Sequence, residues 1–90
     1  MIKHIVMWRL KEENKERNAQ VLKEKLLGLV GVIPEIIDME VGININQADS
    51  CFDVVLSSLF LNMEELGKYQ VNPLHKEVGE YVKTIQTERA

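Results

Sequence analysis

The chain lacks several features that would define its class at once. Its 90 residues include one cysteine, Cys51, which excludes an intrachain disulfide and a cysteine metal cluster. We interpret Cys51 as a small hydrophobic residue at the edge of a loop. No apolar run approaches the ~20 residues of a membrane-spanning helix, and residues 1–14 lack the pattern of a secretory signal. We therefore expect a cytoplasmic protein with no membrane partner.

An excess of basic charge is also missing. The 11 Lys and Arg residues face 14 Asp and Glu residues, which gives a net charge of −3. A nucleic-acid partner is not expected, because neutralising phosphates requires a basic face. Hydrophobic residues make up 46% of the chain, and this length suits a single domain over residues 1–90. A domain this small has a modest core, and extra apolar surface often forms a subunit interface.

Residues 2–10 alternate in the manner of a strand. One face carries Ile2, His4, Val6, Trp8 and Leu10. The other face carries Lys3, Ile5, Met7 and Arg9. Both faces are partly apolar, so we expect both to be covered.

A helix is expected over residues 14–31, with Asn14 as its N-cap and Gly31 just past its end. Its apolar residues fall on one stripe at helical spacing: Ala19, Leu22, Leu26, Leu29 and Val30. Pro34 then indicates a loop.

Two further strands are expected over residues 36–46 and 51–60, joined as a hairpin by a turn at 47–50. The first alternates cleanly, and its apolar face carries Ile37, Met39, Val41, Ile43 and Ile45.

Two helices follow. Asn62 and Glu65 have the spacing of a capping box, which predicts a short helix of about two turns. Asn72 is a favoured N-cap, and Pro73 is favoured at the first position of a final helix. The apolar stripe of that helix carries Leu74, Val78, Tyr81, Val82 and Ile85.

This order predicts an α+β, ferredoxin-like antiparallel sheet with helices on one face. Only residues 86–90 remain for a last strand, which we expect to be short or absent. The other face of the sheet, with Ile5 and Met7, is expected to pack on a second copy as a dimeric α/β barrel.

Four segments together resemble a known family: 3–11 (KHIVMWRLK), 31–36 (GVIPEI), 41–44 (VGIN) and 69–82 (YQVNPLHKEVGEYV). Over nearly its whole length the chain resembles the stress-responsive A/B barrel domain, Dabb. The resemblance implies a ferredoxin-like protomer and a homodimer. It extends more distantly to dimeric α+β barrel monooxygenases and EthD-type proteins. Some plant relatives are polyketide cyclases, and others are known only as heat-stable or stress-induced proteins.

The resemblance also implies site residues. His4, Tyr69 and His75 match polar positions of the cyclase-type pocket. Two departures stand out. Val54 occupies a strand position where a cyclase can carry a further histidine, and the usual last strand has no clear counterpart before Ala90. Loss of that strand would open one edge of the sheet.

The residues alone leave two interpretations of His75 open. With Asn72 as N-cap, His75 is the third residue of the last helix, and Gly79 follows one turn later. Glycine there costs the helix about 1 kcal/mol relative to alanine, but it leaves a recess beside the imidazole. Alternatively, Gly79 permits close packing of helix on sheet, and His75 only caps the helix.

In the catalytic hypothesis, His75 is a general base or forms an acid–base pair with Tyr69. Tyr69 donates a hydrogen bond to a carbonyl or enolate oxygen, and His4 orients the substrate or shares the proton. The expected pocket walls are Val6, Trp8, Leu22, Leu26, Val78 and Gly79. Such a pocket suits a small hydrophobic, aromatic or polyketide-like ligand and an aldol- or Claisen-type proton transfer.

Two other functions stay open. The chain could be a structural or stress-associated dimer in which His4, Tyr69 and His75 serve packing and capping, with Trp8 filling the cavity. It could also be a cofactor-free or haem-dependent monooxygenase of the same superfold, and in the haem-dependent case His75 is the candidate haem ligand.

Metals and cofactors have little support in the sequence, and we expect no cofactor. Two histidines in different elements give no usual zinc spacing. The resemblance implies a magnesium-like ion on main-chain carbonyls after the first helix, which here would be those of Val30, Ile33 and Ile36. A plain helix end with hydrated carbonyls is the alternative.

Overall fold

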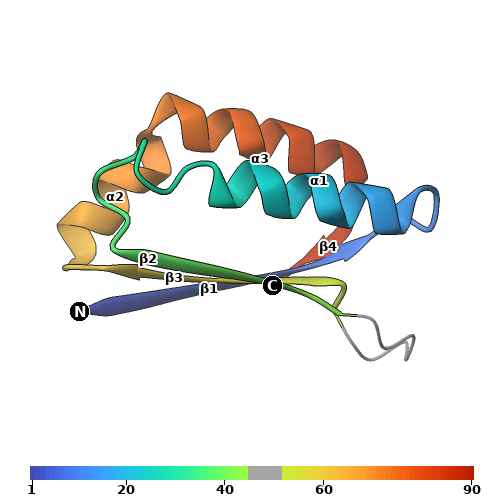
Figure 1. Cartoon of the computed structure of the whole chain (residues 1–90), viewed down its shortest axis with the longest axis horizontal. Coiled ribbons are helices and arrows are strands. Elements are labelled where there is room, and N and C mark those ends of the chain that lie inside the picture. Colours follow the sequence, from blue (N-terminus) through green and yellow to red (C-terminus); the bar gives the residue numbers. More distant parts are fainter. Residues whose placement is uncertain (45–51) are drawn as a thin grey trace.

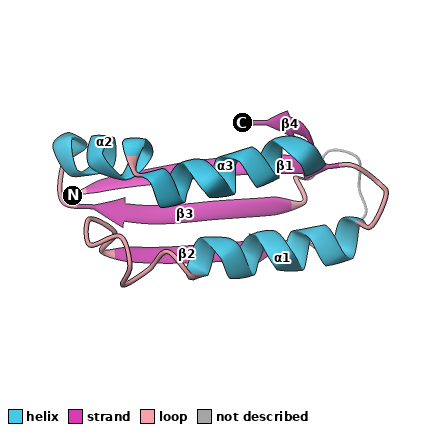
Figure 2. Cartoon of the chain, turned by 90° about the horizontal axis from the view of Figure 1, so that it is seen from above, coloured by secondary structure: helices cyan, strands magenta, loops and turns pink. Residues whose placement is uncertain are grey.

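A computed structural model describes residues 1–44 and 52–90. In chain order its elements are β1 (Ile2–Leu10), α1 (Lys15–Leu27), β2 (Asp38–Ile43), β3 (Val54–Phe60), α2 (Met63–Val71), α3 (Pro73–Ile85) and β4 (Gln86–Arg89). The strands form one antiparallel sheet in the order β2-β3-β1-β4. All the helices lie on one face of this sheet, as Figures 1 and 2 show. The predicted ferredoxin-like α+β fold is confirmed.

The last strand is short rather than absent. β4 is four residues long and pairs antiparallel with β1. Met7 and Ala90 exchange two backbone hydrogen bonds of 2.7 Å each. β1 is therefore an inner strand, and the two edges of the sheet are β2 and β4.

The core fills the space between the helices and one face of the sheet, which we call the covered face. Along β1, Val6, Trp8 and Leu10 are buried on this face. The helices bury Ala19, Leu22 and Leu26 from α1, Leu66 and Tyr69 from α2, and Val78, Val82 and Ile85 from α3.

The first helix differs from its prediction at both ends. It ends at Leu27 instead of continuing to residue 30, and Gly28 occupies its C-cap. Val30 therefore leaves the helical stripe and is exposed, although Leu29 remains buried. Asn14 holds the N-cap position in a left-handed conformation with φ of 55°, and its side chain makes no capping hydrogen bond.

The prediction for β2 was wrong at its start. Ile37 is exposed and precedes the strand, whereas Ile36 is buried. The chain turns sharply before β2, since the Ile36 N–H donates to the Ile33 carbonyl oxygen at 3.2 Å. The predicted positions of Ile45, of the turn at 47–50 and of Cys51 lie outside the described residues.

The two predicted N-caps of the later helices are present. The Asn62 side-chain oxygen accepts the Glu65 N–H at 3.0 Å, and the Asn72 side-chain oxygen accepts the Leu74 N–H at 2.9 Å. Leu74 itself is exposed and does not belong to the buried stripe. With Pro73 as the first residue of α3, His75 is fixed at its third position.

Candidate functional site

A cavity of about 210 Å³ opens between the covered face of the sheet and the helix layer. Eight of the residues proposed from sequence line it: His4, Val6, Trp8, Leu26, Tyr69, His75, Val78 and Gly79. Leu22, also expected in the wall, is fully buried and does not line the cavity. Trp8 leaves this space open, because it is buried at the wall and does not fill it.

His75 is held by a contact that fixes its tautomer. Its Nδ1 lies 3.2 Å from the main-chain oxygen of Gln70, near the end of α2. A carbonyl oxygen can only accept, so Nδ1 carries the hydrogen in this contact and Nε2 of the neutral ring holds a lone pair. Burial is the main effect on the imidazole, and it lowers the pKa of His75 below its ordinary value of 6.5. His75 is thus a neutral base at neutral pH.

Tyr69 provides a neutral phenol beside this base. Its ring is fully buried, 4.9 Å from the ring of Phe60 and 4.3 Å from that of His75 between centroids. Burial raises the pKa of Tyr69 to about 12. At neutral pH the hydroxyl keeps its proton and can donate it to an oxygen acceptor.

His4 lies on β1 and faces the same cavity. Burial first, then the charge of Arg89, and then His75 lower the pKa of His4. Its Nδ1 and the Nε1 of Trp8 are buried without a hydrogen-bond partner among the described residues. Unsatisfied buried polar atoms are uncommon in proteins and carry a cost in free energy, so two of them on the lining residues of one cavity are notable.

The space beside Gly79 bears on one of the two alternatives left open by the sequence. A Cβ built at this position would meet no atom within 4 Å. Close packing of helix on sheet therefore does not require glycine here. Gly79 borders the cavity, so the missing side chain contributes open space beside α3.

Five lining residues were not identified from sequence: Leu56, Val82, Lys83, Gln86 and Arg89. The most consequential is Arg89, because it brings a permanent positive charge. It was missed because residues 86–90 have no apolar alternation that indicates a strand. The available signal was the last strand implied by the family resemblance.

Of the three carbonyls proposed to hold a metal ion, that of Ile33 already accepts a hydrogen bond within the loop. The Leu29 oxygen accepts from Val32 and Ile33, and the Ile33 oxygen accepts from Ile36. In the described part of the chain, no group of three or more His, Cys, Asp or Glu residues could hold a metal ion. Backbone carbonyls can bind a hard cation, but such sites usually include carboxylates as well, so these three carbonyls alone fit it poorly. The carbonyls of Val30, Ile33 and Ile36 stay a prediction, and we assign no chemistry to them.

Together these features define a ferredoxin-like α+β protein with a histidine- and tyrosine-lined cavity under its helices. The chain belongs to the stress responsive A/B barrel domain (Dabb) family, whose model matches residues 2–90. No curated protein matches it. Among residues 1–44 and 52–90, no helix is long and apolar enough to cross a membrane.

Solved structures share the fold. A dimeric ferredoxin-like protein of unknown function from Bacteroides fragilis is 29% identical, with a TM-score of 0.87 over 98% of this chain and 88% of that chain. Hydroxynitrile lyase from Passiflora edulis is 15% identical, with a TM-score of 0.84 over 98% of this chain and 85% of that chain. A candidate monooxygenase from Lactobacillus acidophilus is 18% identical, with a TM-score of 0.76 over 98% of this chain and 40% of that chain.

Proposed function

We propose that this protein binds a small, largely apolar molecule in the cavity and moves a proton on it, with His75 as the general base. The observation that carries the proposal is the convergence of His75, Tyr69 and His4 on one cavity. His75 has its Nδ1–H engaged by Gln70, so its Nε2 is the nitrogen that can take a proton.

The volume of the cavity limits the ligand. An apolar cavity of roughly 150 Å³ accepts benzene. At about 210 Å³, the present cavity suits one substituted ring or a short branched acyl chain. A long polyketide would extend beyond it, and a four-ringed haem would not fit. This size argues against the haem-dependent monooxygenase.

The proposed step is removal of a proton from carbon next to a carbonyl group. The C–H bond breaks, its proton passes to Nε2 of His75, and its electron pair becomes the enolate. The Tyr69 hydroxyl donates a hydrogen bond to the enolate oxygen. His75 then returns the proton to carbon, which completes an isomerisation. Alternatively, the enolate electron pair forms a C=C bond, the bond from the neighbouring carbon to a leaving group breaks, and His75 protonates that group. Such chemistry belongs to lyases and isomerases.

Deuterium exchange tests this step directly. Acetophenone has one ring and exchangeable C–H groups next to its carbonyl. We expect the wild type in D₂O to accelerate exchange of its methyl protons, measured by NMR, and His75→Ala to lose about a hundredfold of that acceleration. The matched control is Lys76→Ala, the exposed neighbour on α3, which should exchange as the wild type does. Equal acceleration by His75→Ala would exclude His75 as the base.

We also propose that the protein is a homodimer through the face of the sheet that carries no helix. This open face carries Ile5, which is 55% exposed, together with Met7 and Val55. The relative from Bacteroides fragilis is dimeric, which supports the same assembly here. Sedimentation at micromolar concentration should give the mass of two chains, and a stable monomer would contradict the proposal.

A further inference from the structure

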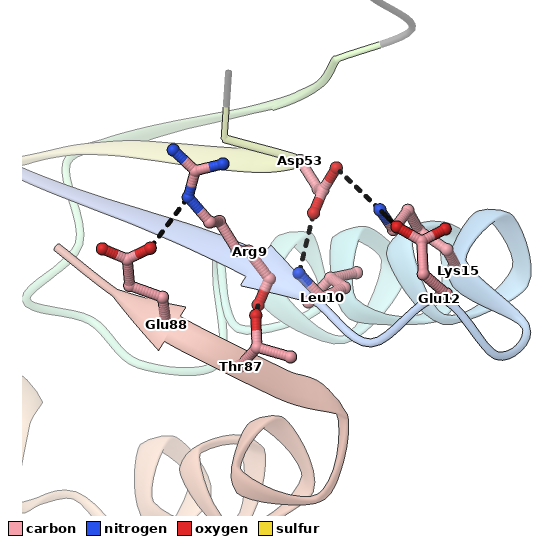
Figure 3. Close-up of polar contacts among 7 residues, drawn as sticks. All are labelled: Arg9, Leu10, Glu12, Lys15, Asp53, Thr87 and Glu88. Carbon is pink, nitrogen blue, oxygen red and sulfur yellow. Dashed lines mark hydrogen bonds and ion pairs between the residues drawn. The ribbon is translucent and has the colours of Figure 1, made fainter. Parts of the chain in front are cut away.

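The short strand β4 brings a cation to the cavity. In the antiparallel register of β1 and β4, Arg89 lies opposite Trp8, and Glu88 lies opposite Arg9. Successive side chains of a strand point to opposite faces. Arg89 therefore lines the cavity under the helices, whereas Glu88 pairs with Arg9 on the open face at 2.8 Å (Figure 3).

The position of Arg89 is well supported by its neighbours. Ala90 and Met7 pair through two backbone hydrogen bonds of 2.7 Å on one side. On the other side, the Thr87 hydroxyl donates to the main-chain oxygen of Arg9 at 3.3 Å (Figure 3). Together with the Arg9–Glu88 ion pair, these contacts hold the backbone of β4 against β1. A cation on a fixed strand is a better ligand contact than one on a loop.

The charge of the cavity is opposite to that of the protein. The chain has a net charge of −3, yet its cavity is lined by two cations, Lys83 and Arg89, and by no Asp or Glu of the described residues. Lys83 pairs with the exposed Glu80 at 3.3 Å. Arg89 has no ion pair with any residue in the ranges 1–44 and 52–90. Its charge is thus available to a ligand.

We propose that Arg89 makes the cavity selective for small carboxylates, with the guanidinium binding the carboxylate while the ligand's apolar body lies against Val6, Trp8 and Val78. This inference deepens the proposed function and rests on it, since it names the substrate class of the same cavity. Planar guanidinium and carboxylate groups match in two parallel hydrogen bonds, which gives this pair its strength and direction.

Electrostatics agree with this geometry. Burial and the charge of Arg89 both lower the pKa of His4 and of His75. For Tyr69, burial raises the pKa, and the charge of Arg89 acts against burial by lowering it. One guanidinium thus acts on His4, His75 and Tyr69 together. A bound carboxylate would offset that charge and raise the pKa of His75, which would strengthen it as a base.

The test compares two ligands of nearly the same shape, cyclohexanecarboxylate and cyclohexanecarboxamide. Trp8 is the only tryptophan of the chain and lines the cavity, so its fluorescence reports binding without a label. At neutral pH we expect the wild type to bind the carboxylate about tenfold or more tightly than the amide. Arg89→Gln should remove this preference, and Arg89→Lys should keep part of it.

A control separates local from general charge effects. Lys76→Gln also removes one positive charge, but from an exposed position of α3 outside the cavity lining, and it should leave both affinities unchanged. Unchanged melting temperatures would show that Arg89→Gln keeps β4 in place. A second readout needs no ligand: in Arg89→Gln the pKa of His75, measured by NMR, should rise.

The outcomes distinguish the two proposals. Equal binding of the two ligands by the wild type, or an unchanged preference in Arg89→Gln, would overturn carboxylate selectivity and leave the cavity as a binding site. Failure of the wild type to bind either ligand would overturn selectivity as well. The acetophenone exchange described above would then decide the proposed function separately.

Discussion

The two faces of the sheet are formed by the same strands but carry different side chains. On β1, His4, Val6 and Trp8 lie under the helices, while Ile5 and Met7 alternate with them on the open face. The covered face combines an apolar core with a cavity that has polar and charged side chains at its wall. The open face combines apolar and charged residues with no cover from the described helices (Figure 1). We assign chemistry to the first face and association to the second.

The largest expected effect is on the core of the covered face. Phe60 is fully buried on β3 and packs on Tyr69 at 4.9 Å. Phe60→Ala should lower the free energy of unfolding by about 3–5 kcal/mol, measured by urea denaturation. The adjacent Leu61 is 57% exposed, and Leu61→Ala should cost less than about 0.5 kcal/mol. Similar costs for the two would contradict the assignment of the core.

A single charge introduced on the open face should disrupt the proposed dimer. Ile5→Glu would place a carboxylate in the proposed interface without a partner, and we expect the dimer to dissociate about a hundredfold more readily. Val32→Glu is the matched control, because Val32 is 59% exposed but follows α1 in the helix layer. Sedimentation equilibrium of the three proteins measures the difference. Equal dimerisation of Ile5→Glu and wild type would place the interface elsewhere.

A smaller effect tests whether the ligand binds in the cavity next to Gly79. Gly67 in α2 and Gly79 in α3 both have open space where a Cβ would lie, but Gly79 alone of the two lines the cavity. Both alanine variants should stabilise the fold by about 0.5–1 kcal/mol, because alanine favours the helix. Gly79→Ala should also weaken binding of cyclohexanecarboxylate, whereas Gly67→Ala should not. Equal affinities of Gly79→Ala and the wild type for cyclohexanecarboxylate would mean that the ligand does not occupy the open space beside Gly79.

The smallest expected effect is on the pH dependence of stability. The pKa values of His4 and His75 are lowered from 6.5 by folding, so below pH 6.5 the unfolded chain binds more protons than the folded one. The contribution of these two histidines to the free energy of unfolding is therefore fully present above pH 6.5. It decreases as the pH drops toward their pKa values in the folded protein. His75→Gln should flatten this slope in denaturation curves. A slope that His75→Gln leaves unchanged would contradict the lowered pKa of His75.

Much of the covered face could be predicted from the sequence because its residues repeat with a simple period. Alternation on β1 and the helical stripes placed Val6, Trp8, Leu26 and Val78 on one side. Asn72 and Pro73 then fixed the start of α3, and with it the position of His75.

The features that the sequence did not predict depend on the pairing register of strands and on turns of the backbone. Arg89 reaches the cavity because β4 pairs with β1, and those backbone bonds leave no trace in the residue pattern. Ile37 has the right period for β2, but the turn at Ile33–Ile36 gives the buried position to Ile36. The Nδ1 contact of His75 likewise joins α3 to the main-chain oxygen of Gln70 in α2, and a backbone oxygen leaves no signal in the residue pattern.

The most direct test of the central claim is the tautomer of His75 in the free protein, measured by nitrogen-15 NMR at neutral pH. The account predicts a neutral ring with its hydrogen on Nδ1, a lone pair on Nε2, and a titration midpoint below 6.5. A hydrogen on Nε2, or a ring that is protonated at neutral pH, would contradict the role of His75 as the base of this cavity.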